Sequence, residues 1–196
     1  MTRSSSPPPK KVKTEHKKKN LIINAFLMGS AGNQTINNWR NPNDRTTELF
    51  SNPNYWTDLA KLLEKGKFNT VFLADVLGPY DVYKGPSNLE PVARVGSQFP
   101  TLDPSYFIPL MAAVTKKLAF GITISTISEQ PYHLARRLGT LDLISNGRVG
   151  WNIVTSYLNS AARNLLNGEN LPPNDVRYAR AEEYVDVVYK LSLIHI

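Results

Sequence analysis

Between residues 21 and 191, short apolar runs alternate with stretches in which apolar residues recur every three or four positions. A short apolar run rich in β-branched residues is typical of a buried strand, and the wider spacing is typical of an amphipathic helix. The apolar runs predict four strands, at residues 21–27, 70–76, 118–126 and 149–154. The spaced patterns predict four helices, at residues 55–65, 104–115, 134–144 and about 177–191.

Strands and helices therefore alternate in the order βαβαβαβα. Because a helix lies between successive buried strands, neighbouring strands are expected to be parallel. Two architectures satisfy this order, a doubly wound sheet and a (β/α)8 barrel. Long loops after the first two strands favour the barrel, which needs eight strands and about 250 residues. The expected fold is α/β, a TIM barrel truncated to about its first four βα units.

Two of the predicted helices show a clear apolar spacing. In the first helix, Trp56, Leu59, Leu62 and Leu63 are expected to face inward. In the third, Leu134, Leu138, Leu141 and Ile144 recur at helical spacing.

The positive charge of the chain is concentrated at its start. The formal net charge is +7, and residues 1–20 hold seven Lys or Arg against Glu15 alone. We expect these residues to form a disordered basic tail, since they lack apolar periodicity. The segment PPPKKVK resembles a nuclear-import cluster, and a solvated tail is the alternative. Because the rest of the chain is nearly neutral, nucleic-acid binding is not expected of the folded part.

Polar residues follow the third and fourth predicted strands. Ser125, Ser128 and Glu129 come at or after the end of the third strand, and Ser156 and Tyr157 follow the fourth. In parallel α/β folds the functional site lies at the carboxyl ends of the strands. We therefore expect the site at this edge of the sheet.

Several kinds of catalytic site are excluded by the residues available. The chain has no cysteine, and its histidines are His16, His133 and His195. It contains no phosphate-binding glycine loop, no HExxH and no GxSxG. A His-based metal site or a serine triad is therefore not expected, and the chemistry is assigned to a bound cofactor.

Several ordered segments resemble one known family. They are NAFLM, YWTDLAKLLEKGKF, VFLADVLGPYDVYKGP, SQFPTLDP, EQPYHLARRLGTLD, NGRVGWNIVTSYLNSAARN and RYARAEEYVDVVYKL. In this order they are similar to the amino-terminal half of the bacterial luciferase-like flavin monooxygenases. The branch resembled contains the nitrilotriacetate, dibenzothiophene-sulfone and long-chain alkane monooxygenases. The similarity covers about residues 21–191.

The resemblance implies a two-component, FMN-dependent monooxygenase with a TIM-barrel fold. Such an enzyme takes reduced FMN from a separate NAD(P)H:flavin reductase and uses dioxygen to oxygenate a small organic substrate. A cytoplasmic homo-oligomer without membrane association is expected, with a nuclear location as the alternative suggested by the basic tail. Two other functions stay open: a deazaflavin-dependent oxidoreductase of the same fold, and a non-catalytic protein whose basic tail binds nucleic acid.

The resemblance also implies residues that hold the flavin. Asp75 matches an acidic residue beside the flavin ring, and its alternative role is to cap a loop. Thr123 matches a flavin contact in the third strand, although a lone Thr in a strand usually serves packing.

Two further residues correspond to the phosphate site. Tyr178 matches a tyrosine that binds the FMN phosphate, and the first turn of a helix also favours an anion. Asn174 stands where the family form HDxRY has histidine, so it can donate to phosphate but carries no charge. Its alternative is a plain helix cap.

Three residues are candidates for contact with the substrate. Tyr80 and Gln98 match loop positions that line the substrate pocket in relatives. Tyr157 replaces a residue that is histidine in some relatives, so a proton step assisted by histidine is in doubt here.

The last residues, 192–196, are predicted to be a non-native terminus. LSLIHI resembles the translation of a sequencing adapter, and a natural apolar helix end is the alternative. On the adapter hypothesis residues 21–191 are the first half of a longer barrel. An isolated half-barrel exposes two strand edges, and we expect it to be poorly soluble and inactive alone.

Overall fold

A computed structural model describes residues 20–32, 38–50, 52–85, 87–96 and 98–191. Nearly all of the predicted basic tail and all of the predicted non-native terminus lie outside these residues. No helix in the described part of the chain is long and apolar enough to cross a membrane.

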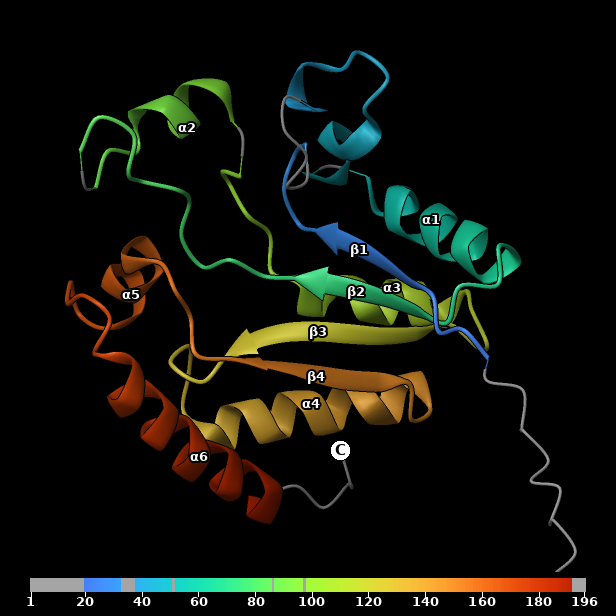
Figure 1. Cartoon of the computed structure of the whole chain (residues 1–196). Helices are drawn as coiled ribbons and strands as arrows, with labels where there is room; N and C mark the ends of the chain where they lie inside the picture. The colour runs from blue at the N-terminus through green and yellow to red at the C-terminus, as the bar shows by residue number, and fades with distance from the viewer. Residues whose placement is uncertain (1–19, 33–37, 51, 86, 97, 192–196) are drawn as a thin grey trace, which may run out of the picture.

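The fold is built on a four-stranded parallel sheet with the strand order β1-β2-β3-β4 (Figure 1). Each strand therefore lies beside the one that precedes it in the chain, as in a barrel. A doubly wound sheet would instead reverse its strand order at a switch point. The strands are β1 (Asn24–Met28), β2 (Thr70–Ala74), β3 (Ala119–Ser125) and β4 (Val149–Val154).

The α-helices occupy two places relative to the sheet (Figure 1). Three lie along the sheet, namely α1 (Pro53–Lys65), α3 (Phe107–Ala113) and α4 (Pro131–Ser145). Two short ones lie beyond the carboxyl ends of the strands, namely α2 (Glu90–Val95) and α5 (Asn159–Leu165). The long helix α6 (Asn174–Leu191) packs against α4. Three short 3-10 helices lie at Asn38–Arg40, Arg45–Phe50 and Pro104–Tyr106.

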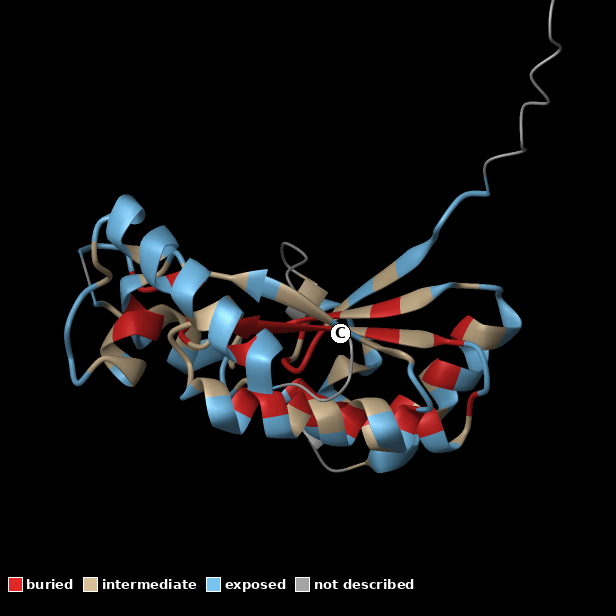
Figure 2. Cartoon of the chain, turned by 90° about the horizontal axis from the view of Figure 1, so that it is seen from below, coloured by how far each residue is buried: buried red, intermediate tan, exposed pale blue. Residues whose placement is uncertain are grey.

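The hydrophobic core lies between one face of the sheet and the helices. Figure 2 shows helices along one side of the strands, with buried residues on the side that meets the sheet. This covered face of the sheet is apolar, and its buried side chains are Val71, Leu73, Phe120, Ile122 and Ile124. On the helix side, the ring of Trp56 in α1 stacks on Phe107 in α3, with ring centroids 3.9 Å apart. Burial of this face stabilises the sheet through the hydrophobic effect.

No helix of the described residues packs along the other face of the sheet. Successive strand residues point to opposite sides, so this open face presents Phe26, Phe72, Gly121, Thr123 and Asn152. Phe26 remains 47% exposed, although its ring stacks on that of Phe72 at 5.8 Å. In a closed barrel such a face becomes the interior.

The structure corrects several predicted boundaries and orientations. The first strand begins at Asn24, not at residue 21, because its partner β2 begins only at Thr70, and Leu21 is 85% exposed. Leu62 was expected to face inward, but it is 64% exposed. Helices α2 and α5 were not predicted, because both are short and lie in segments without apolar periodicity.

Candidate functional site

Two adjoining cavities open at the carboxyl ends of the strands. The first, called here the sheet pocket, measures about 470 Å³ and lies on the open face between β1 and β4. The second, called the loop pocket, measures about 350 Å³ and extends toward the loop 98–103 and α4. Asp75 and Thr123 line both cavities, so these two residues stand at the boundary between them.

The sheet pocket combines an apolar floor with a few polar groups. Phe26, Phe72 and Ala74 supply the apolar part. Thr123 lies opposite Asn152 in the β3–β4 register, and the amide of Asn152 donates a hydrogen bond of 3.0 Å to its hydroxyl. This bond fixes the Thr123 side chain in the middle of the sheet. A pocket of this composition suits a flat, largely apolar ligand with a polar edge.

Asp75 directly follows β2 and is half-buried at the boundary between the cavities. Burial, with a smaller effect of the nearby carboxylate of Asp103, raises the pKa of Asp75 to about 7, and Arg137 acts in the opposite direction. Near neutral pH the group is therefore partly protonated, so it can both donate and accept hydrogen bonds.

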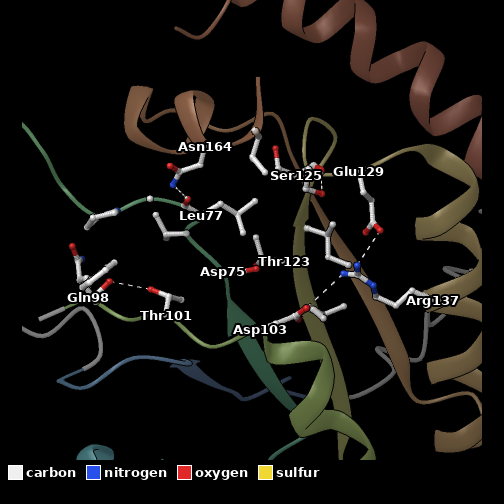
Figure 3. Close-up of a pocket in the computed structure, with 18 residues that line it drawn as sticks. Asp75, Leu77, Gln98, Thr101, Asp103, Thr123, Ser125, Glu129, Arg137 and Asn164 are labelled. Atoms are coloured by element: carbon white, nitrogen blue, oxygen red, sulfur yellow. Dashed lines mark hydrogen bonds and ion pairs between the residues drawn. The ribbon is translucent and has the colours of Figure 1, made fainter. Parts of the chain in front are cut away.

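An ion-pair cluster lies beside Asp75 in the loop pocket (Figure 3). Arg137 of α4 contacts Glu129 at 2.9 Å and Asp103 at 4.0 Å. Burial raises the pKa of Glu129, and its Oε1 is buried without a hydrogen-bond partner among the described residues. The single guanidinium thus faces two carboxylates besides Asp75, so this wall of the loop pocket has an excess of negative charge.

Tyr80 and Tyr157 meet at the exposed rim of the site. Their hydroxyl oxygens are 2.9 Å apart, although the residues lie on different loops. Burial, followed by the hydrogen bond between the hydroxyls of Tyr157 and Tyr80, raises the pKa of Tyr157 to about 12. Tyr157 lines the sheet pocket and holds its proton at all physiological pH values.

Helix α5 holds the loop that follows β2. The hydroxyl of Ser160 donates to the carbonyl of Pro79 at 2.7 Å, and Arg163 pairs with the buried Asp81 at 3.1 Å. Gly78 lies so close to α5 that a Cβ atom there would be 2.4 Å from the backbone nitrogen of Ala161. The segment that carries Tyr80 is therefore fixed in place by α5.

The start of α6 brings Tyr178 to the sheet pocket. Tyr178 lines the pocket, whereas Asn174 lies one helical turn earlier and lines neither cavity. Positions four residues apart share one side of a helix. Within the described residues, the side-chain oxygen of Asn174 accepts a hydrogen bond from Arg177 and from no backbone N–H group.

The structure thus gathers most of the predicted site residues. Asp75, Thr123, Tyr157 and Tyr178 line the sheet pocket, Gln98 lines the loop pocket, and Tyr80 reaches Tyr157. Asn152 was not predicted as a site residue, because it is a single polar side chain within the mostly apolar run of β4. The ion pairs of Arg137 were not predicted either, because the three partners lie far apart in the sequence.

Comparison with known proteins places this arrangement in a family. The model of the family described as luciferase-like monooxygenase matches residues 35–192. The chain belongs to the luciferase-like monooxygenase family. The predicted family and the truncated α/β barrel are thereby confirmed.

Individual relatives in the family are similar over most of this chain. It is 46% identical to dimethyl-sulfide monooxygenase of Hyphomicrobium sulfonivorans, covering 89% of this chain and 35% of that protein. It is also 46% identical to long-chain alkane monooxygenase of Geobacillus thermodenitrificans (strain NG80-2), covering 88% of this chain and 38% of that protein.

Solved structures are also similar over most of the chain. A crystal structure of long-chain alkane monooxygenase matches with a TM-score of 0.82 at 46% identity, over 89% of this chain and 39% of that one. A riboflavin lyase, solved with a modified FMN and riboflavin, matches with a TM-score of 0.74 at 34% identity, over 88% and 38%. The chain therefore spans between a third and two fifths of the length of these relatives.

Proposed function

We propose that this chain belongs to the oxygenase of a two-component monooxygenase, which uses reduced FMN and dioxygen to oxygenate a small organic substrate. The observation that carries the proposal is the sheet pocket, where groups from β2, β3, β4 and α6 converge at the carboxyl ends of parallel strands. The monooxygenase relatives support it, as does the FMN in the structure of riboflavin lyase.

The residues of the sheet pocket fit a flavin. Phe26, Phe72 and Ala74 form an apolar surface for a flat ring, and Thr123 and Asp75 offer polar groups beside it. We assign Thr123 to a contact with the ring, in an orientation held by Asn152. Asp75 would face a polar edge of the ring, where a partly protonated carboxyl can donate as well as accept. The bound flavin supplies the oxidative chemistry.

The phosphate is assigned to the start of α6. The hydroxyl of Tyr178 and the side-chain amide of Asn174 are hydrogen-bond donors one turn apart. The unpaired N–H groups of a helix start also favour an anion. These two residues would therefore hold the charged end of FMN, while its ring lies on the open face.

Tyr157, Tyr80 and Gln98 are proposed to contact the substrate. The tyrosine pair stands at the exposed rim, and its hydroxyl groups can orient a substrate or an oxygen species by hydrogen bonding. With the proton held at physiological pH, Tyr157 would act as a donor and not as a base. Gln98 would act from the loop pocket.

The remaining proposals concern the whole protein. A separate NAD(P)H:flavin reductase would supply the reduced FMN, and the complete protein would be a cytoplasmic homo-oligomer. The matched relatives are bacterial, which gives the nuclear alternative no support. Residues 1–196 alone are proposed to be inactive, because a sheet of four strands leaves the site open on one side.

The proposal is tested with the protein as its gene encodes it. FMN binding is measured by fluorescence quenching, and ¹⁸O₂ incorporation is followed with NADH, FMN and a flavin reductase. The trial substrates are dimethyl sulfide, a long-chain alkane and dibenzothiophene sulfone. We expect FMN binding and ¹⁸O in one product, and weaker FMN binding in Thr123→Val but not in the exposed control Tyr106→Phe. Absence of FMN binding by the wild-type protein would refute the proposal.

A further inference from the structure

Arg177 occupies an unusual position in the first turn of α6. Its neighbours Val176 and Tyr178 are exposed, whereas Arg177 is half-buried. The guanidinium Nη1 donates to the carbonyl oxygen of Thr155 at 3.2 Å and to that of Ser156, and Nη2 donates to the side-chain oxygen of Asn174. Its Nε is buried and makes no hydrogen bond within the described residues. The guanidinium therefore faces the protein, so we do not assign it to the ligand itself.

These hydrogen bonds connect two parts of the candidate site. Thr155 and Ser156 directly follow β4, and Ser156 adopts a left-handed backbone conformation with φ of 63°. The hydroxyl of Ser156 lies 2.7 Å from that of Ser125 at the end of β3. Arg177 thus holds the start of α6 against the carboxyl ends of two strands.

The same contact determines which way the amide of Asn174 points. An arginine side chain can only donate hydrogen bonds, whereas an asparagine amide has one accepting oxygen and one donating NH₂ group. The oxygen must therefore face Arg177, because the opposite orientation would place two donors against each other. Within the described residues the NH₂ group makes no hydrogen bond. It is left as a donor on the helix side shared with Tyr178.

We propose that Arg177 is a positioning residue, which fixes the amide of Asn174 so that its NH₂ group binds the phosphate of FMN. The inference rests on the proposed function. It explains how a neutral asparagine serves where the family form has histidine. The positive charge is carried by Arg177, which contacts the amide of Asn174 and not the phosphate. A hydrogen bond that involves a charged group is stronger than a neutral one, so the orientation is well held.

The orientation is tested by Asn174→Asp in the protein as its gene encodes it. The aspartate keeps an oxygen for Arg177 but has no NH₂ group, and Asn174→Ala removes both. Dissociation constants are measured by fluorescence quenching for FMN and for riboflavin, which lacks the phosphate. We expect both variants to bind FMN about tenfold or more weakly, as for the loss of a hydrogen bond to a charged group, and riboflavin to within about twofold of wild type. An Asn174→Asp variant with wild-type FMN affinity would overturn the orientation.

The role of Arg177 is tested by Arg177→Met, with the exposed Arg180→Met on the same helix as the matched control. We expect Arg177→Met to lower FMN affinity about tenfold with little change for riboflavin, and Arg180→Met to change neither. In the Asn174→Ala background, Arg177→Met should cost no further FMN affinity, because the two residues act as one unit.

Other outcomes would refute the positioning role of Arg177, the phosphate site or the proposed function. If Arg177→Met weakens both flavins equally, or has its full effect in the Asn174→Ala background, the positioning role is refuted. If wild-type protein binds FMN and riboflavin equally, the phosphate inference fails while flavin binding stands. If it binds neither, the proposed function fails and the inference with it. If Arg177→Met does not fold, the two Asn174 variants still test whether the NH₂ group binds the phosphate. Asn174 is exposed, so substitutions there should not prevent folding.

Discussion

The two faces of the sheet differ although they are made by the same four strands. The covered face is apolar and closed by α1, α3 and α4, and Phe120 and Val71 on it are fully buried. The open face mixes aromatic rings with Thr123, Asn152 and glycine, and it forms the sheet pocket. Alternate residues of one strand therefore have different roles. One set stabilises the fold, and the other set presents groups to a ligand.

The largest expected effect comes from truncating a side chain on the covered face. Phe120→Ala should lower the free energy of unfolding by about 3–5 kcal/mol, since it leaves a cavity in a fully buried core. Its matched control on the open face, Phe26→Ala, should cost about 1 kcal/mol or less, because that ring is half exposed already. Urea denaturation measures both variants, and equal losses of unfolding free energy would contradict the different roles of the two faces.

Asp75 lies where the open face meets the loop pocket, and it gives a pH test. Its folded pKa is raised to about 7, whereas the unfolded chain loses this proton near 3.8. The folded state therefore binds more protons between these values, and stability falls as the pH rises from about 4 to 7. The amplitude is at most about 4 kcal/mol, and Asp75→Asn should abolish most of it. Stability is followed by urea denaturation across this pH range. If stability fell with pH as steeply in Asp75→Asn as in the wild type, the raised pKa of Asp75 would be refuted.

Gly78 tests the contact between the loop after β2 and α5. A Cβ atom at this position would lie 2.4 Å from Ala161 N and 2.6 Å from the carbonyl carbon of Ser160. Gly78→Ala should therefore lower the unfolding free energy by about 1–3 kcal/mol, as for overpacking. Gly150→Ala is the control, because an added Cβ there meets nothing within 4 Å. Thermal unfolding compares the two, and an unaffected Gly78→Ala would contradict the close contact.

The smallest effect is expected at the tyrosine pair. Tyr80→Phe removes one exposed hydrogen bond and should change the unfolding free energy by less than about 1 kcal/mol. It should also lower the pKa of Tyr157 from about 12 toward the ordinary value of tyrosine, since the hydrogen bond with Tyr80 contributes to the shift. An alkaline titration followed by NMR of labelled tyrosine measures this. An unchanged pKa would show that the pair does not form in solution.

Much of the sheet could be predicted because buried parallel strands are short apolar runs. Residues 149–154 were predicted with the bounds that the structure has, and the strand order follows from the barrel. The first strand was extended too far, because the pairing with β2 begins only at Asn24, beyond the apolar residues Leu21 and Ile22. Periodicity alone also placed Leu62 inward, although the face of α1 that meets the sheet is narrower than its apolar stripe.

The candidate site was less predictable because it depends on contacts between distant segments. Asp75 and Thr123 could be found from strand ends and family motifs. The bond between Thr123 and Asn152 needs the strand register, and the bond between Tyr80 and Tyr157 joins loops 77 residues apart. Arg177 carried no signal either, since an arginine in the first turn of a helix usually points to solvent.

The contacts of α5 also limit how the site can open. The loop after β2 is bound to α5 at Pro79, Asp81 and Leu77. Because α5 follows β4 through a short connection, the loops after β2 and β4 are held together and are expected to move together. Entry of a large molecule between them requires a joint displacement, whose energetic cost includes all of these bonds at once. Access is thereby directed away from the gap between these two loops.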